Sequence, residues 1–335
     1  MATHPALVGI GGNNIDVVYR VDRVAGQEMK TSILPQKGRR APVLLVGGVT
    51  LNHVGWASVL GASTGLIAKQ AKDRYGDILR QAMDRLSVDR SHVSLDGSAS
   101  DFTLIFVSQD GGRAIYMAPA AITETRPDEI RDIHTEYIAE ARILSTEISQ
   151  LPLSCVVEAV RIAKHAGARV AVDVDLPPSY AIGEGGLGTS AQLNEILTLA
   201  DIVKPTKEAA MDLFPGKRDA LALAKMMVER YGSGTPNKIC AITDGQRGCA
   251  VASGKEAFTL EAARIGQAAD TTGAGDAFLG GFLAGMLKNL AVRDAAMLAN
   301  AAGAACCEQL GAFPRSRDAR ARVMEYYASL GGTSL

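Results

Sequence analysis

Asp270-Thr271-Thr272-Gly273-Ala274-Gly275-Asp276 is the stretch that decides the fold, because polar residues and glycines end here and an apolar run begins. The run from Ala277 to Leu287 predicts a buried helix. The two glycines allow a tight turn and a close approach of the backbone to a ligand. The first amides of the helix have no partner within it, and the positive end of its dipole lies behind them. The turn therefore predicts an anion hole suited to a nucleotide phosphate.

Asp276 lies at the mouth of this predicted hole. A carboxylate there is well placed to accept a proton from a hydroxyl that attacks phosphorus. Phosphoryl transfer depends mostly on positioning and charge stabilisation, so little other protein chemistry is needed. Thr272 and Asp276 could also be ordinary helix-capping residues. Gly-Ala-Gly-Asp alone leaves both interpretations open, whereas the full stretch before a glycine-containing apolar helix is far more specific.

Composition and charge exclude several classes of protein. The chain has 335 residues, of which 47% are hydrophobic, so it can form a large core, and its net charge of -1 gives no indication of nucleic-acid binding. The five cysteines form no CxxC pair, and their odd number argues against a disulfide framework. Residues 6–10 are too short an apolar run for a signal peptide, and no stretch approaches the roughly 18 apolar residues of a membrane span. We expect a cytoplasmic protein.

Apolar runs alternate with helical patterns along most of the chain. The run 6–10 ends at Gly11-Gly12, which is typical of a strand buried in a parallel sheet. Helices are predicted in 69–86, 153–166, 220–231, 277–287 and 291–309, and strands at 169–174, 202–204, 238–243, 248–250 and 257–260. This alternation predicts an α/β fold, a doubly wound and mostly parallel sheet with helices on both faces.

Two segments have a different pattern. Short strand-like runs occur at 15–18 and 43–46, and two more, 102–107 and 113–117, are joined by Gln109-Asp110-Gly111-Gly112. Asp-Gly between such runs indicates a hairpin. We therefore predict a small β-sheet lid from residues 15–50 and 95–118. The core domain would comprise residues 1–14, 51–94 and 119–335.

Residues 270–283 resemble the C-terminal signature of the ribokinase (PfkB) family of carbohydrate and nucleoside kinases. The family pattern is roughly Asp-Thr-x-Gly-Ala-Gly-Asp-x-Phe before a glycine-rich helix, and this chain matches it without a gap. The similarity covers most of the chain. It implies a ribokinase-like fold and ATP-dependent transfer of the γ-phosphoryl group to a sugar or nucleoside hydroxyl. In these terms Asp276 is the general base, and the amides of Gly273, Ala274 and Gly275 form the anion hole.

Two further motifs resemble the substrate side of the family's site. Gly47-Gly48-Val49-Thr50-Leu51-Asn52 is similar to the family's Gly-Gly-x-x-x-Asn, in which Gly47, Gly48 and Asn52 would contact substrate hydroxyls. An asparagine side chain both donates and accepts hydrogen bonds, which suits a polyol. Asp16, after Gly11-Gly12-Asn13-Asn14-Ile15, falls where the family has an aspartate that binds a substrate hydroxyl. Taken alone, each motif could be plain turn and cap chemistry.

Thr243-Asp244-Gly245-Gln246-Arg247-Gly248 resembles the family's Thr-x-Gly-x-x-Gly, so Thr243, Gly245 and Gly248 are predicted to line the nucleotide site. A hairpin turn is the alternative. Asn300, on a helix of small residues, falls in the stretch that the resemblance places beside adenine. Helix packing is the alternative there.

The metal-organising motif departs from the family pattern. Many members carry Asn-x-x-Glu where this chain has Lys204-Pro205-Thr206-Lys207-Glu208, so Thr206 takes the Asn position and Ala209 the Glu position. Glu208 is one residue early and is the nearest candidate ligand. Mg²⁺ is still expected, because the charge of ATP must be shielded. The resemblance also suggests K⁺ near Asp270.

The substrate is less closely defined. Some sugar-kinase relatives carry Asp-x-Asn-x-Arg where this chain has Asp173-Val174-Asp175-Leu176-Pro177. The missing Arg favours a neutral polyol or nucleoside, although Arg113 could restore an anion contact. Family resemblance suggests a homodimer through the lids. Two other functions stay open: a catalytically silent nucleotide sensor, because of the altered Asn-x-x-Glu region, and a nicotinamide-dependent oxidoreductase, because of the N-terminal glycines.

Overall fold

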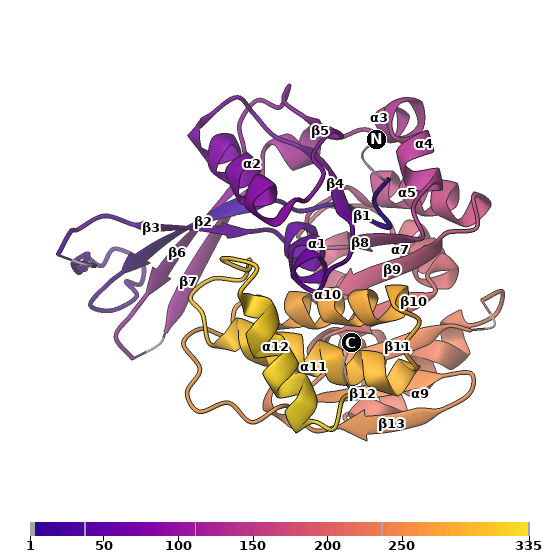
Figure 1. Ribbon diagram of the computed structural model, residues 1–335. Coiled ribbons are helices and arrows are strands. Elements are labelled where there is room, and N and C mark those ends of the chain that lie inside the picture. Colours follow the sequence, from indigo (N-terminus) through magenta and orange to yellow (C-terminus); the bar gives the residue numbers. More distant parts are fainter. Residues whose placement is uncertain (1–3, 37, 111, 236, 334–335) are drawn as a thin grey trace.

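The main sheet forms the centre of the molecule (Figure 1). The structure is a computed structural model that describes residues 4–36, 38–110, 112–235 and 237–333. Within these residues the sheet has nine strands in the order β13-β12-β11-β10-β9-β8-β1-β4-β5. Neighbouring strands from β11 to β5 are parallel, and β12 and β13 form an antiparallel edge. The strands are β1 (Leu7–Ile10), β4 (Thr64–Lys69), β5 (Val93–Ser94), β8 (Ile143–Glu147), β9 (Arg169–Val174), β10 (Ile202–Pro205), β11 (Ile239–Thr243), β12 (Cys249–Ser253) and β13 (Ala257–Leu260).

Helices cover both faces of this sheet. Successive residues of a strand point to opposite faces, so Leu7 packs into one hydrophobic cluster and Val8 into the other. The first cluster is built on α1 (Val49–Val59), α2 (Arg74–Leu86), α10 (Ala274–Leu287), α11 (Val292–Cys307) and α12 (Ala319–Ser329). The second is built on α3 (Pro127–Ile133), α4 (Thr135–Ala139), α5 (Leu153–His165), α7 (Ser190–Leu199), α8 (Lys207–Leu213) and α9 (Ala220–Tyr231). Helix α10 is apolar on all sides, as expected of a helix buried between α1 and α11.

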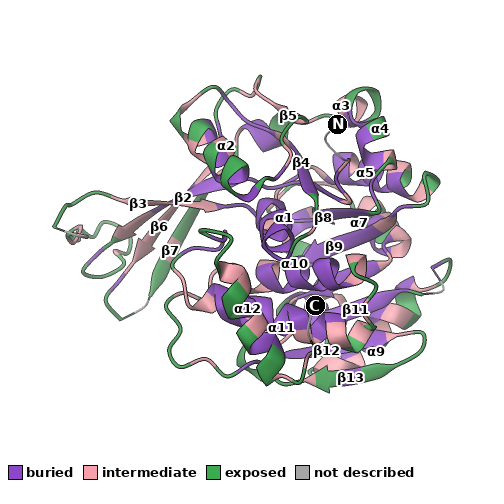
Figure 2. Ribbon diagram, in the orientation of Figure 1, coloured by how far each residue is buried: buried purple, intermediate pink, exposed green. Residues whose placement is uncertain are grey.

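A second sheet projects from the core (Figure 1). In the described part of the chain it has four strands in the order β3-β2-β6-β7. These are β2 (Asn14–Arg20), β3 (Val43–Gly47), β6 (Phe102–Val107) and β7 (Arg113–Ala118). The inner strands β2 and β6 are parallel, while β3 and β7 pair antiparallel at the two edges. Much of β7 is exposed (Figure 2).

The predicted fold class is confirmed, and the small sheet uses all four predicted strand-like runs. Gly111, in the predicted hairpin turn, lies outside the described residues. Some predicted boundaries were wrong. Residues 64–69 are strand β4, and the helix predicted over 69–86 begins only at Arg74, where Asp73 caps it by accepting a hydrogen bond from the Gly76 amide at 2.8 Å. None of the described helices is long and apolar enough to cross a membrane.

Candidate active site

The turn before α10 is held in one shape by its surroundings. Gly273 has a φ of 76° at the N-cap of α10, and a Cβ there would lie 2.1 Å from the Ala312 Cβ. One oxygen of Asp270 accepts hydrogen bonds from the Thr272 amide at 3.0 Å and the Thr272 hydroxyl at 2.7 Å. The other accepts from the Gly311 amide at 3.1 Å. The turn is therefore fixed before any ligand binds, and within it the Ala274 amide donates to the Thr271 carbonyl at 3.3 Å.

Asp276 lies in the first turn of α10 and is joined to the substrate-side helix α1. The Asn52 amide nitrogen donates a hydrogen bond to Asp276 Oδ2 at 2.7 Å. Burial raises the pKa of Asp276, and the hydrogen bond from Asn52 acts against this rise. This hydrogen bond connects two residues that are 224 positions apart in sequence. It occupies Oδ2 of Asp276 and leaves Oδ1 out of the bond.

Asp16 is hydrogen-bonded to Asn14 and lies against Gly47, the last residue of β3. The side-chain nitrogen Nδ2 of Asn14 donates a hydrogen bond to Asp16 Oδ1 at 2.8 Å. A Cβ on Gly47 would lie 2.9 Å from Asp16 Oδ2. Gly48 has a φ of 104°, and a Cβ there would lie 2.4 Å from the Asn13 Cα. Only glycine fits at Gly48, because both its backbone conformation and its neighbour exclude a side chain. Burial raises the pKa of Asp16 to about 6, and the charges of Asp270 and Asp276 add to the rise.

A cavity of about 280 Å³ lies between the small sheet and the core, beside Asn14. Its polar lining is made of amide, hydroxyl and carboxylate groups, and none of its described lining residues is Lys or Arg. The polar members are Asn13, Asn14, Asp101, Thr103, Thr123, Ser149, Gln150, Tyr180 and Glu184. The apolar members include Phe102 and Met117 of the small sheet. This volume and these groups suit a neutral polyol held by hydrogen bonds.

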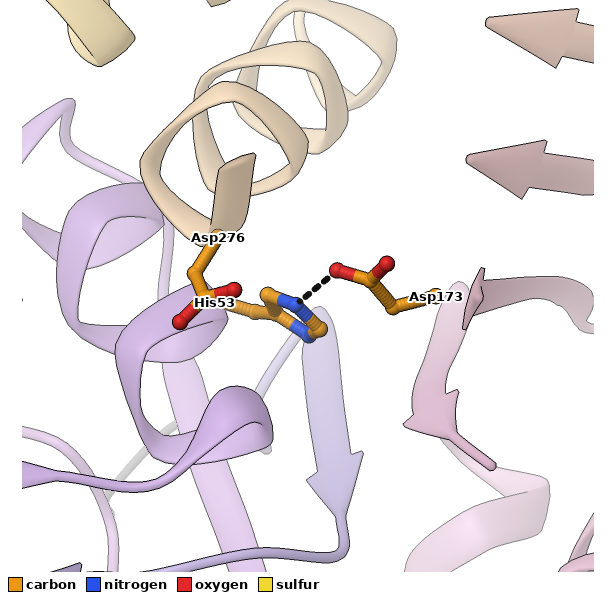
Figure 3. Close-up of side chains that lie close together, drawn as sticks. All are labelled: His53, Asp173 and Asp276. Atoms are coloured by element: carbon orange, nitrogen blue, oxygen red, sulfur yellow. Dashed lines mark hydrogen bonds and ion pairs between the residues drawn. The ribbon is translucent and has the colours of Figure 1, made fainter. Parts of the chain in front are cut away.

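Buried polar side chains form a network beside Asp276, and Figure 3 shows two of them, His53 and Asp173, together with Asp276. The nitrogen His53 Nε2 lies 3.0 Å from Asp173 Oδ2, and Nδ1 lies 3.1 Å from the Ser145 hydroxyl. Because an ionised carboxylate only accepts, Nε2 carries the proton and donates to Asp173. Lys204 Nζ lies 2.7 Å from the other oxygen of Asp173, as an ion pair without the angles of a hydrogen bond. Burial opposes ionisation of Asp173, but the charge of Lys204 prevails and lowers its pKa.

Two sets of residues could be considered for a metal. His53, Asp173 and Asp276 each offer a ligand atom within 4.8 Å of the others, but the ammonium of Lys204 already balances Asp173 and would repel a second cation. Asp175 is the other candidate, because one of its oxygens has no partner in the described part of the chain, and the charge of Lys204 acts on this carboxylate as well. Its Oδ1 is shielded from solvent without a hydrogen-bond partner among the described residues. Burial raises the pKa of Asp175 to about 8, with a further contribution from Asp173, and a nearby cation would relieve both.

The predicted nucleotide-side residues lie at the ends of β10 and β11. Thr206 forms an isolated bridge with Thr243, so these two lie side by side. Thr206 also caps α8, because its hydroxyl accepts from the Ala209 amide at 3.1 Å. Gly248 has a φ of 88°, and a Cβ there would lie 2.1 Å from the Leu260 carbonyl oxygen; Gly245, with a φ of 54°, is open.

Asn300, the remaining nucleotide-side prediction, and Glu208, the predicted metal ligand, both lie close to this turn. Asn300 bonds to Glu261, which packs against Gly248, and the charge of Glu208 acts on Arg247. Asn300 donates to the Glu261 carbonyl at 3.0 Å and is mostly buried. Glu208 is exposed on the first turn of α8. Its role as a metal ligand stays a prediction, as do the nucleotide contacts.

Comparisons with known proteins identify the family of this chain. The family model described as pfkB family carbohydrate kinase matches residues 7–318. The chain belongs to this family. An uncharacterized sugar kinase of Archaeoglobus fulgidus is 30% identical over 78% of this chain and 99% of its own length. A probable fructokinase-5 of Arabidopsis thaliana is 28% identical over 94% of this chain and 95% of its own.

Solved structures of a ribokinase and of an adenosine kinase share the fold. Arabidopsis thaliana ribokinase, complexed with ribose and ATP, superposes with a TM-score of 0.80 at 21% identity, over 97% of this chain and 99% of its own. The adenosine kinase of Sinorhizobium meliloti gives 0.78 at 21% identity, over 96% and 100%. At these identities the likeness shows the fold alone, so the site roles rest on the geometry.

Sequence reasoning missed the network beneath the pfkB signature. Nothing in the sequence connects His53 with Lys204. Both side chains contact Asp173, which is 120 positions from His53 in sequence. The positions of Asp173 and Lys204 at the ends of two predicted strands could have indicated the network. Asp173 and Lys204 stand opposite each other on neighbouring strands β9 and β10, near the carboxyl ends where α/β sheets bind ligands.

Proposed function

We propose that this protein is an ATP-dependent kinase that transfers the γ-phosphoryl group to a hydroxyl of a neutral sugar or nucleoside. The observation that carries the proposal is the 2.7 Å hydrogen bond between Asn52 and Asp276, at the mouth of the fixed glycine turn. It joins a residue predicted to hold the acceptor to the carboxylate predicted to activate it. The family relationship and the absence of Lys and Arg from the described cavity lining add support.

In the proposed reaction Asp276 accepts the proton of the attacking hydroxyl. The bond from substrate oxygen to γ-phosphorus forms as the bond from that phosphorus to the bridging oxygen of ADP breaks. The amides at Gly273 and Gly275, and that of Ala274 in exchange for its bond to the Thr271 carbonyl, donate to the phosphoryl oxygens, where the helix dipole favours negative charge. Asp16 and Asn52 orient the acceptor, so that its oxygen is in line with the breaking bond.

Magnesium fits this arrangement through Asp175 and, as a second candidate, Glu208. Asp175 has the shielded and unpartnered oxygen, whereas Glu208 faces solvent at the end of β10. When bound with ATP, Mg²⁺ neutralises phosphate charge. Asp270 has both oxygens occupied by backbone and hydroxyl donors, so its proposed nearness to K⁺ would use other atoms of this loop.

The proposal is tested by an ADP-release screen with Mg²⁺ over pentoses, hexoses, keto-acid sugars and nucleosides. We expect turnover with one neutral class, and a fall of about 10²–10⁴-fold in Asp276→Asn. An Asp276→Asn enzyme with full activity would refute the assignment of the base. ATP binding without turnover on any acceptor would instead favour the silent sensor, and tight binding of NADH without ATP would favour the oxidoreductase.

We also propose that two lids pair in a homodimer. Ile115, Tyr116 and Met117 of strand β7 are each more than half exposed, at 57%, 56% and 54%. Apolar side chains exposed together on a sheet edge are typical of an interaction surface. Size-exclusion chromatography with light scattering should give a dimer for the native chain and a monomer for Ile115→Ser/Tyr116→Ser. A native monomer at micromolar concentration would contradict the proposal.

A further inference from the structure

Two lysines among the described residues are completely buried, and they differ in how their ammonium groups are satisfied. Lys238 is 1% exposed and donates to backbone carbonyls of Leu197 at 2.8 Å and Thr198 at 3.3 Å, and also to that of Ala200. Its three N–H groups therefore have three acceptors. Lys204 is 0% exposed, yet its Nζ has no hydrogen-bond acceptor in good geometry among the described residues.

The ammonium of Lys204 lies directly against the glycine turn of residues 270–276, here called the anion turn. Its side chain rises from the carboxyl end of β10, and Nζ lies 2.7 Å from Asp173 Oδ1. A Cβ placed on Gly275 would lie 3.0 Å from the same Nζ, so the ammonium and the turn are in contact. Asp173 can occupy at most one of the three N–H groups. At least two donors of a buried cation therefore remain free beside the turn.

Stability does not explain such an arrangement. A buried ion pair is costly to desolvate, and apolar residues of similar volume are often as stable or more so. A buried charged donor without an acceptor carries a further cost. Asp173 is itself held by His53 at 3.0 Å, which fixes the position of the ammonium. A bound anion would accept hydrogen bonds from the free N–H groups of Lys204 and would offset the cost of burying its charge.

We propose that Lys204 binds the phosphoryl group being transferred, through the N–H groups that Asp173 leaves free. The inference rests on the proposed kinase function and assigns a charge to its anion hole. The turn amides supply neutral donors, and Lys204 supplies a full positive charge that does not depend on the altered Thr206–Glu208 region. Asp173 and His53 are positioning residues, because they act through Lys204 rather than on the substrate.

The test uses a charge-neutral pair, since Lys204→Met alone would leave Asp173 buried and unpaired. In Lys204→Met/Asp173→Asn both charges are removed, so we expect a folded protein. Calorimetric titration with Mg·ATP and Mg·ADP should show affinity for ATP reduced by about 10- to 100-fold, with affinity for ADP unchanged. The kcat should fall by about 10²–10³-fold. Asp173→Asn alone keeps the lysine but removes the charge that positions it, so it should lower the ratio of ATP to ADP affinity by less than the double variant does.

Lys238→Met is the matched control for a buried lysine with a structural role. It should lower the unfolding temperature and leave the ratio of ATP to ADP affinity unchanged. A double variant that is folded and keeps both the native affinity ratio and the native kcat would overturn the role of Lys204 while leaving the kinase proposal intact. A native chain that binds neither nucleotide would overturn both. Loss of ATP and ADP affinity to the same extent would show that Lys204 supports the nucleotide site without contacting the γ-phosphoryl group, and would also overturn the inference.

Discussion

The anion turn and the small sheet approach the site from different sides, and they are specified in different ways. The turn is one contiguous stretch, residues 270–276, whose shape is fixed by a glycine at positive φ, a braced aspartate and contact with Ala312. The small sheet pairs β2 with β6, whose partner residues are 87 positions apart in sequence, and leaves much of β7 exposed (Figure 2). The turn is therefore rigid and local, whereas the sheet depends on long-range pairing. In the proposed function the first region sets the chemistry, and the second recognises the acceptor.

The largest effect should come from breaking the rigid region at Gly273. In Gly273→Ala the new Cβ would lie 2.1 Å from the Ala312 Cβ and would also strain a φ of 76°. The turn must shift, and its amides would no longer point at the phosphoryl group. We expect kcat to fall by about 10²–10³-fold, measured by ADP release.

Gly167→Ala separates backbone strain from displacement of the turn. Gly167 has a similar φ of 81°, but nothing lies within 4 Å of its would-be Cβ. Its substitution should cost about 1–2 kcal/mol of stability and leave kcat unchanged. If Gly273→Ala behaved like Gly167→Ala in kinetics, the turn would not be the anion hole.

The next effect should appear where the two regions meet, at Asn52. Asn52→Leu removes the donor to Asp276, and the pKa of that carboxylate should rise further because the hydrogen bond favours its ionised form. The acidic limb of the pH profile of kcat/KM should move to higher pH, and kcat should fall by about 10- to 100-fold. Thr50→Val, buried on the same helix but bonded to the Ile10 carbonyl, is the control. An unmoved acidic limb would mean that Asp276 is not the titrating base.

The buried carboxylate of Asp16 is predicted to bind the acceptor, and its ionisation should lower the stability of the folded protein. Its pKa is raised from 3.8 to about 6, so the folded state resists its ionisation. The contribution of the neutral carboxyl to stability is therefore present below pH 4 and is lost as the pH rises through about 6.

Asp16→Asn keeps an oxygen that can accept from Asn14 and removes the charge. The variant should be more stable than the native chain by about 1–3 kcal/mol above pH 7, and equally stable below pH 4. The KM for the acceptor should rise by about tenfold or more. Denaturant unfolding at both pH values and steady-state kinetics measure this. Equal stability of the two proteins at pH 8 would contradict the raised pKa.

The same contrast explains what could be read from the sequence. Helix α10 and its turn were predictable because glycines, capping residues and the apolar run are adjacent. The parallel pairing of β2 with β6 was not, because the register depends on contacts across the fold, such as Ile15 opposite Phe102. Lys204 ends a short apolar strand, where a lysine usually reaches solvent, so its burial against Asp173 needed the structure.

The smallest effect should come from the contact that joins the two regions directly. Arg113 of β7 donates to the Thr272 hydroxyl at 3.1 Å and lies 3.5 Å from Asp270 Oδ1, with its side chain 41% exposed. An exposed ion pair is weak and is screened by salt, so Arg113→Gln should raise the KM of a neutral acceptor no more than about fivefold. The difference should shrink as salt is added, while Arg20→Gln, at the exposed end of β2, should have no effect. A loss in kcat that persists in high salt would instead mean that Arg113 acts on the phosphoryl group itself. The first residue of β7 would then belong to the catalytic part of the site, together with residues 270–276.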